Sequence, residues 1–307
     1  MWYNKHFHSL NYELKEHFGE KIIKLSIDGG FTCPNRDGSV GNRGCIFCND
    51  TGSGDFAGSR SDSIKKQIEK QIENLKTKWP NAKYIAYFQN FTSTYDSIPN
   101  LKKKYEEALS CKNVIGLAIA TRPDCLNQDI LDLLSQLNKK TYLWIELGLQ
   151  SIHEHSAKFI RRGYPLKTFD IAINNLNKYN IKTVTHIILN LPNENTEEVL
   201  QTISYLNSKS IWGIKIHMLH ILKNTDLFDF YSTRPFKIMT EEEYVNLVVK
   251  CLQHLDPNIT IHRMTGDGKK SELITPIWTL NKRSVLNNID KTLRQKNLIQ
   301  GDKYLNI

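Results

Sequence analysis

The chain has 307 residues, of which 40% are apolar, enough for one large α/β domain or for one domain with a modest extension. No run approaches about eighteen consecutive apolar residues and the N-terminal segment lacks the order of a signal peptide, so we expect a cytoplasmic protein without a membrane span. The formal net charge of +9 favours a polyanionic partner such as a nucleic acid.

Short apolar runs rich in β-branched and aromatic residues alternate with amphipathic segments along most of the chain. In chain order we predict six strands, over residues 22–28, 83–88, 114–120, 142–148, 182–189 and 213–219. The amphipathic segments between them lie near residues 61–78, 100–110, 127–138, 152–161, 167–179 and 196–208. These segments are long enough for right-handed crossovers between parallel strands.

Six such units are too few for a closed eight-stranded barrel, and the chain lacks the glycine-rich first turn of a dinucleotide-binding fold. We therefore predict an α/β fold, an open TIM-like (β/α)6 partial barrel with its site at the carboxyl ends of the strands. A helix near 240–254, a strand near 259–263 and a helix near 283–297 follow. We predict that residues 1–235 form the barrel with its N-terminal segment and that residues 236–307 form a C-terminal α/β extension that covers it.

Three of the six cysteines lie within sixteen residues, in the loop that follows the first predicted strand. Cys33, Cys45 and Cys48 form a Cys-x11-Cys-x2-Cys pattern, which is not the layout of a disulfide scaffold. A [4Fe–4S] cluster normally takes four thiolates, so a loop that offers three leaves one iron open to another ligand. A structural zinc site is an alternative, but it would need a fourth nitrogen or sulfur ligand. Free buried thiols are a third interpretation.

The loop resembles that of radical S-adenosylmethionine (radical SAM) enzymes. In that family the amino and carboxylate groups of S-adenosylmethionine bind the open iron, and an electron from the cluster cleaves the molecule to methionine and a 5′-deoxyadenosyl radical. The resemblance implies a [4Fe–4S] cluster on Cys33, Cys45 and Cys48, S-adenosylmethionine as cofactor, and an electron donor such as flavodoxin or ferredoxin. It also implies that Phe47 packs beside the adenine.

Further stretches extend the resemblance over nearly the whole chain: FTCPNRDG, YFQNFTSTY, ATRPD, ELGLQS, RRGY, HIILNLP, KIHMLHILKNT and HRMTGD. They are similar to bacterial enzymes that share a catalytic domain organisation with the Elongator catalytic subunit. One group of these converts a carboxymethylaminomethyl side chain on the wobble uridine of tRNA to aminomethyl. The resemblance therefore implies tRNA as substrate and a tRNA methyltransferase as a downstream partner. The chain departs from the family at Asn190 and Asn193, where members usually carry glycine.

Polar residues follow the second, third and fourth predicted strands. The resemblance implies that Gln89 and Asn90, after the second strand, meet the methionine amino group. Thr121 ends the third strand, and Arg162 lies in the loop beyond the fourth. The planar guanidinium of Arg162 suits a carboxylate or a phosphate. We predict that all four residues contact the cofactor.

Three predicted strands carry ionisable groups. A period of two in the fourth strand places Glu146 and Gln150 on one face and leucines on the other, and we predict that this face lines the barrel and contacts the cofactor. His186 lies in the fifth strand, and Lys215 and His217 lie in the sixth. Ionisable groups inside strands must be paired or must meet a ligand, and we predict that these three manage protons in catalysis. The alternative is that Glu146 and Lys215 neutralise each other in the core.

The segment HRMTGDGKK in the extension contributes Arg263 and Asp267, for which we predict a role on the substrate side, with a cap or turn as the alternative. Two other functions remain open at this level. One is a radical SAM enzyme that acts on a small molecule or a protein side chain. The other is a zinc-dependent nucleic-acid-binding module without catalysis.

Overall fold

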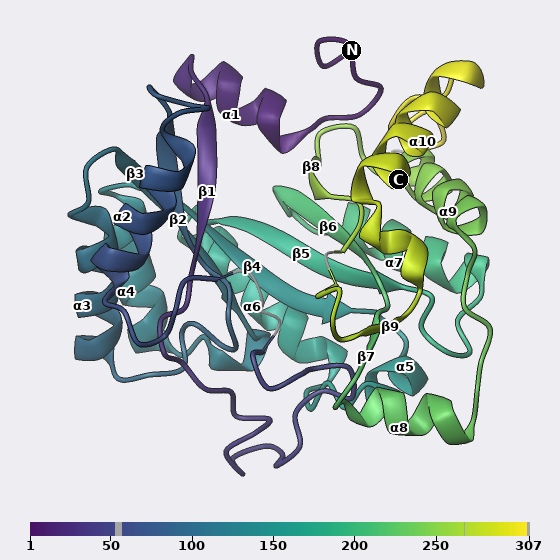
Figure 1. Cartoon of the computed structure of the whole chain (residues 1–307), viewed down its shortest axis with the longest axis horizontal. Coiled ribbons are helices and arrows are strands. Elements are labelled where there is room, and N and C mark those ends of the chain that lie inside the picture. Colours follow the sequence, from purple (N-terminus) through teal and green to yellow (C-terminus); the bar gives the residue numbers. More distant parts are fainter. Residues whose placement is uncertain (53–56, 267, 306–307) are drawn as a thin grey trace.

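The computed structural model describes residues 1–52, 57–266 and 268–305. Parallel strands form one sheet in the order β1-β2-β3-β4-β5-β6-β8. They are β1 (Ile22–Ile27), β2 (Lys83–Phe88), β3 (Val114–Thr121), β4 (Tyr142–Gln150), β5 (Lys182–Leu189), β6 (Gly213–Met218) and β8 (Thr260–Arg263). The sheet curls into a half-barrel (Figure 1). The predicted partial barrel is therefore confirmed.

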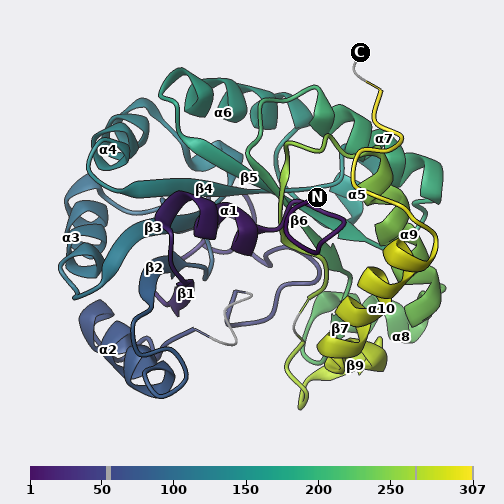
Figure 2. The ribbon, with the colours of Figure 1, turned by 90° about the horizontal axis from the view of Figure 1, so that it is seen from above.

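Helices cover the outer face of the sheet, as Figure 2 shows from above. Those that join the first six strands are α2 (Ile64–Leu75), α3 (Ile98–Leu109), α4 (Gln128–Asn138), α5 (Glu154–Phe159), α6 (Leu166–Lys178) and α7 (Thr196–Asn207). Three of them begin at the N-caps Ser63, Asn127 and Asn195, whose side-chain oxygens accept backbone N–H bonds. Their apolar faces and the outward side chains of the strands form one continuous core.

The C-terminal part adds a seventh strand to the half-barrel. Helix α9 (Glu241–His254) leads into β8, which pairs in parallel with β6. The sequence predicts six barrel strands with the remaining strand in the extension, whereas the structure pairs that strand with the barrel sheet. The reason is physical: β6 would otherwise present an unpaired row of backbone groups, and α9 supplies the same kind of crossover as the earlier helices.

Smaller elements complete the described part of the chain. They are α8 (Asp226–Thr233), α10 (Lys282–Gln295), the antiparallel strands β7 (Ile221–Leu222) and β9 (Leu273–Thr275), and the 3-10 turns η1 (Pro123–Cys125) and η2 (Ile277–Leu280). Helix α10 packs beside α9. Of the helices in the described ranges, none combines the length and the apolar character that crossing a membrane would require.

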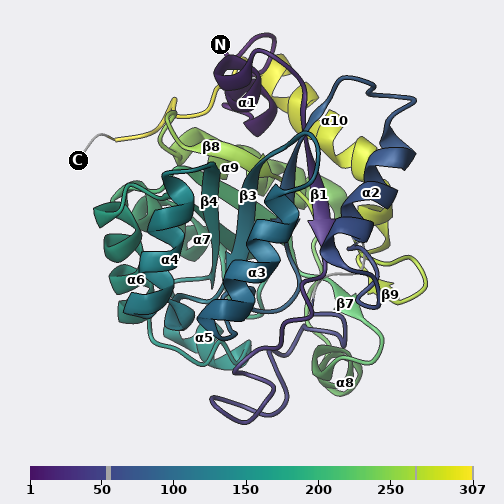
Figure 3. The same cartoon turned by 90° about the vertical axis from the view of Figure 1, so that its left-hand side faces the viewer.

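Helix α1 (Leu10–Phe18) closes the amino end of the half-barrel. Its buried Leu10 and Leu14 pack in one cluster with Ile85, Tyr87 and Trp144, which point into the barrel. Figure 3 shows α1 at the amino end of β1 and the long loop after β1 at the opposite end. The barrel interior is therefore sealed on the α1 side and accessible at the carboxyl ends of the strands.

Candidate functional site

A cavity of about 630 Å³ opens at the carboxyl ends of the strands. It is lined by the loop after β1, by residues of the barrel strands, and by the segments that follow β6 and β8. The sequence-predicted residues that line it are Cys33, Cys45, Phe47, Cys48, Gln89, Thr121, Glu146, Gln150, His186, Lys215 and His217. The structure thus brings together side chains from six different segments of the sequence.

The cysteine loop is held in place by backbone contacts and by small residues. The carbonyl of Cys33 accepts the backbone N–H of Arg36 at 2.8 Å, and the N–H of Cys48 donates to the carbonyl of Cys45 at 3.0 Å. Gly44 has a φ of +73°, and a Cβ there would lie 2.9 Å from Nε of Arg36. A side chain at position 44 would therefore meet both backbone strain and a steric clash.

The Cys45 thiol lies in a partly buried, polar setting. Asn35 Nδ2 lies 3.5 Å from Cys45 Sγ and donates to the carbonyl of Arg161 at 2.7 Å. Burial, with the neighbouring Cys48, raises the pKa of the Cys45 thiol to about 12. A metal ion at the sulfur would lower this pKa, because a coordinating thiol is deprotonated.

The carboxylate of Glu146 is the centre of a buried polar network inside the barrel. It accepts hydrogen bonds from Trp144 Nε1 at 2.9 Å, from His186 Nε2 at 2.8 Å and from Lys215 Nζ. Lys215 Nζ also donates to the hydroxyl of Tyr87 at 2.9 Å. Burial alone would raise the pKa of Glu146, but the Lys215 ammonium and the bond from His186 hold it well below its usual value. Glu146 and Lys215 therefore form the pair that the sequence left as an alternative.

The two histidines of the network are neutral near pH 7. Burial and the nearby Lys215 lower the pKa of His186 to about 4. Because Glu146 is ionised, the Nε2 of His186 carries the hydrogen, which fixes the tautomer of the ring. The ring of His217 lies 5.2 Å from that of His186, and burial lowers its pKa well below the usual value. Within the described residues, Nε2 of His217 is buried without a hydrogen-bond partner.

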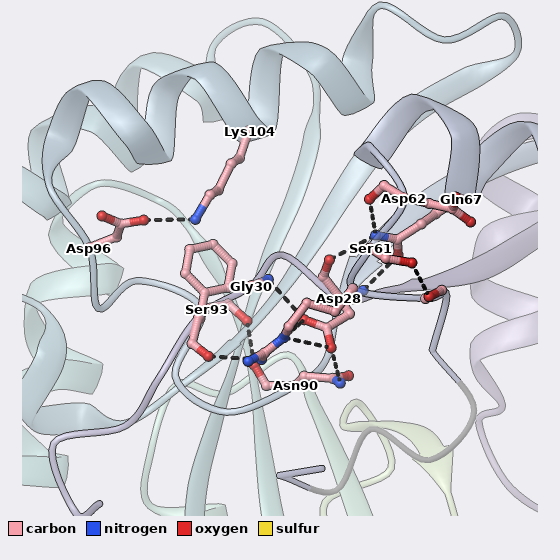
Figure 4. A network of polar contacts seen from close by, with 12 residues as sticks. Asp28, Gly30, Ser61, Asp62, Gln67, Asn90, Ser93, Asp96 and Lys104 are labelled. Carbon is pink, nitrogen blue, oxygen red and sulfur yellow. Dashed lines mark hydrogen bonds and ion pairs between the residues drawn. The ribbon is translucent and has the colours of Figure 1, made fainter. Parts of the chain in front are cut away.

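Two predicted cofactor residues, Asn90 and Arg162, do not line the cavity. Figure 4 shows Asn90 directed at Asp28, whose carboxylate accepts its Nδ2 at 3.0 Å. Arg162 is only 2% exposed, and it donates to the carbonyls of Tyr164 at 3.1 Å and of Ser151 at 2.6 Å. Asn90 therefore supports the start of the cysteine loop, and Arg162 supports the chain beyond β4.

Other residues that sequence reasoning did not assign to the cofactor line the cavity. Arg122 forms a two-pronged pair with Asp124, at 2.9 and 2.6 Å, and follows Thr121 directly at the end of β3. The same strand-end position that marks Thr121 could have marked it. Arg263 also lines the cavity, whereas Asp267 lies outside the described residues.

Asn190 and Asn193 both adopt left-handed backbone conformations, with φ of +66° and +65°. Asparagine tolerates this region better than other non-glycine residues, so both can stand where the family usually has glycine. Asn190 also makes two bonds that glycine could not. Its Nδ2 donates to the carbonyl of Lys237 at 3.1 Å, and its Oδ1 accepts the N–H of Met239 at 2.8 Å.

Family models and known proteins match this chain over most of its length. The model of the radical SAM superfamily matches residues 38–206, and that of the radical SAM C-terminal domain matches residues 211–295. YtqA of Bacillus subtilis is 43% identical over 297 residues, which cover 97% of this chain and 92% of that protein. YhcC of Escherichia coli K12 is 33% identical and covers 94% of this chain and 92% of that protein.

A more distant likeness extends to the Elongator proteins. Elongator complex protein 3 of Drosophila melanogaster is 30% identical over 168 residues, which cover 53% of this chain and 30% of that protein. The structure of the archaeal Methanocaldococcus infernus Elp3 matches with a TM-score of 0.70 at 16% identity, over 92% of this chain and 64% of that chain. At this identity the structural match shows a shared fold. By the family models and by relatives that match almost its full length, the chain belongs to the radical SAM superfamily.

Proposed function

We propose that this protein is a radical SAM enzyme that converts a carboxymethylaminomethyl side chain on the wobble uridine of tRNA to aminomethyl. The observation that carries the proposal is one cavity with three cysteines on its rim and buried ionisable groups in its interior. The partial likeness to Elongator complex protein 3 and the net charge of +9 support a tRNA substrate. The proposal requires an electron donor such as flavodoxin or ferredoxin. It also suggests a downstream partner, a tRNA methyltransferase that acts on the aminomethyl product.

The residues of the cavity fit the cofactors that the superfamily implies, a [4Fe–4S] cluster and S-adenosylmethionine. Three thiols from one loop line the cavity, and a cluster of several irons can bind each thiolate on a different iron. Metal ligands must be deprotonated, so iron would bind these cysteines as thiolates and displace their protons. In the described part of the chain, no three His, Cys, Asp or Glu side chains are arranged to hold a single metal ion, as a zinc knuckle would require.

The cavity also has the size and polarity of a cofactor site. Ligand pockets of drug-sized molecules measure about 300–1,000 Å³, and this one measures about 630 Å³. In our proposal Cys33, Cys45 and Cys48 hold the cluster. The residues that contact S-adenosylmethionine are Phe47, Gln89, Thr121, Arg122 and Gln150. When bound, these cofactors would supply a 5′-deoxyadenosyl radical, which can take a hydrogen atom from the carbon next to the substrate carboxylate.

The protein itself contributes positioning, exclusion of water and control of protons. Helix α1 and its apolar cluster close the amino end of the barrel, and the cavity lies at the opposite end, beside the cysteine loop. Glu146 holds His186 and Lys215 in fixed positions. Because His186 and Lys215 are held by Glu146, His217 is the group in this network that is best able to exchange a proton with the substrate.

The proposal is tested by anaerobic reconstitution with iron and sulfide, followed by incubation with S-adenosylmethionine, a reductant and tRNA that carries the carboxymethylaminomethyl group. The protein should turn brown, release 5′-deoxyadenosine and convert the nucleoside to the aminomethyl form. Cys45→Ala should lose all three properties, whereas Cys111→Ala, a buried cysteine away from the cavity, should keep them. A colourless protein with one bound zinc would refute the proposal, and cleavage without nucleoside conversion would refute its substrate.

A further inference from the structure

The interior of the cavity is richer in basic than in acidic side chains. Of the described residues that line it, Glu146 is the only one with a carboxylate. The basic lining residues are Arg36, Arg122, Lys215 and Arg263. Glu146 already accepts hydrogen bonds from three side chains, so its charge serves to balance Lys215 within the protein. Arg263 adds a guanidinium, with several N–H donors, to the lining.

A shift in strand register directs Arg263 into the cavity. In the pairing of β6 with β8, Ile214 lies opposite Ile261, but Lys215 lies opposite Arg263 rather than His262. Two residues of β8, His262 and Arg263, thus follow Ile261 where β6 has only Lys215 after Ile214, as in a β-bulge. A bulge changes the direction of the side chains that follow it. Without the shift, strict alternation would turn Arg263 away from the face that carries Lys215. Instead both side chains line the cavity.

His217 and Lys215 add hydrogen-bond donors beside this guanidinium. Nε2 of His217 is buried without a partner among the described residues, although His217 lines the cavity. Lys215 Nζ has three hydrogens, of which Glu146 and Tyr87 take two. Burial lowers the pKa values of both Lys215 and His217, and the positive charge of Arg263 lowers them further. Lys215 lies opposite Arg263 in the strand pairing, and all three side chains line the same cavity, so an anion bound there would meet donors from each of them.

We propose that Arg263, Lys215 and His217 form a carboxylate-binding subsite, in which Arg263 is the main anion-binding residue. The inference rests on the proposed function for its ligand, which is the carboxylate of the carboxymethylaminomethyl side chain. A guanidinium can bind both oxygens of a carboxylate at once. Because the carbon that loses hydrogen is bonded directly to this carboxylate, holding it also fixes the reacting carbon. The aminomethyl product has no carboxylate and is therefore released more easily than the substrate is.

The test compares tRNA that carries the carboxymethylaminomethyl group with tRNA that carries the aminomethyl group. The reconstituted wild-type enzyme should bind the first more tightly. Arg263→Gln should raise KM for the substrate tRNA on the order of tenfold to a hundredfold and remove this preference. Arg263→Lys should retain part of this preference, because lysine keeps the positive charge but cannot bind both carboxylate oxygens as a guanidinium does. Lys140→Gln removes one exposed positive charge far from the cavity and should behave as wild type.

Release of 5′-deoxyadenosine without tRNA is measured on the same variants and should not change in Arg263→Gln. A loss there would assign Arg263 to the carboxylate of S-adenosylmethionine and overturn the subsite. Unchanged KM and an unchanged preference between the two tRNAs in Arg263→Gln would also overturn it. If the wild-type enzyme converts no tRNA at all, the proposed function fails instead.

A second measurement tests the subsite without tRNA. N-methylglycine carries the same secondary amine and carboxylate as the end of the proposed side chain, whereas dimethylamine lacks the carboxylate. N-methylglycine should raise the melting temperature of the reconstituted wild-type protein but not that of Arg263→Gln, and dimethylamine should raise neither. Equal effects of N-methylglycine on both proteins, or none on the wild type, would contradict the subsite.

Discussion

At the scale of single residues, the buried carboxylate of Glu146 organises the interior of the barrel. Its side chain is fully buried, and Lys215 depends on it for charge balance. Glu146→Gln should lower the free energy of unfolding by about 3–5 kcal/mol, because an uncompensated ammonium would remain in the core. Urea denaturation of the wild type and the variant measures this difference.

The matched control for that prediction is the double variant Glu146→Gln, Lys215→Met, which removes both charges. It should recover part of the lost stability, because a buried pair costs less to replace than to break. If the free energy of unfolding of Glu146→Gln lay within about 1 kcal/mol of the wild-type value, the role given to Glu146 would be contradicted.

The protonation of His186 should be visible in the pH dependence of stability. Its pKa is about 4 in the folded protein and about 6.5 when unfolded, so the unfolded chain binds more protons between these values. The contribution of neutral His186 to the free energy of unfolding is therefore fully present above pH 6.5 and is lost as the pH falls toward 4. His186→Gln should flatten the rise of unfolding free energy over this range, as measured by urea denaturation at a series of pH values. Parallel curves for the two proteins would show that His186 does not titrate in this way.

Strand periodicity predicted which residues of the strands enter the barrel, whereas residues after the strand ends were predicted correctly only in part. Glu146, Lys215 and His217 line the cavity because alternation in a strand is a geometric rule. Asn90 and Arg162 lie beyond the ends of their strands, where the chain turns and no period applies. Their carbonyl and carboxylate partners come from other segments, so these contacts depend on tertiary structure.

At the scale of elements, the turn after β5 ties the barrel to the segment before α9. Asn190 makes the two bonds to Lys237 and Met239, whereas its neighbour Asn193 shares only the left-handed backbone. Asn190→Gly should cost about 1–2 kcal/mol of unfolding free energy, because the loss of two hydrogen bonds outweighs the relief of backbone strain. Thermal unfolding of the variant measures the cost.

Asn193→Gly is the matched control at this turn. Glycine adopts the same φ without strain, and within the described ranges the Asn193 side chain makes no hydrogen bond that holds the segment, so the free energy of unfolding should change by less than about 0.5 kcal/mol. If Asn190→Gly and Asn193→Gly lowered the free energy of unfolding equally, the role of Asn190 in linking β5 to α9 would be contradicted.

The sequence predicted some helices and strands but not others. All six predicted strands and the helices between them are present, because long periodic segments repeat one pattern many times. Helix α1 was not predicted, since it has only nine residues and its buried side chains are few. Nor does a local pattern reveal that β8 joins β6, because the pairing of strands is decided by contacts distant in sequence.

At the scale of the whole molecule, the curled sheet places chemistry from distant parts of the sequence around one cavity. The cysteine loop follows β1, and the proposed carboxylate subsite comes from β6 and β8, which lie toward the opposite end of the strand order. A half-barrel brings these ends near one another, whereas a flat sheet would hold them apart (Figure 2). The fold thus allows a cofactor and a substrate to share one enclosed space.

The central claim, that this radical SAM enzyme acts on the wobble uridine of tRNA, is tested most directly by the nucleosides of bulk tRNA from a strain that lacks the gene. The account predicts that carboxymethylaminomethyl-uridine accumulates and that aminomethyl-uridine and its methylated product decline. A plasmid with the wild-type gene should restore the profile, and one with Cys45→Ala should not. A nucleoside profile unchanged by the deletion would contradict the claim.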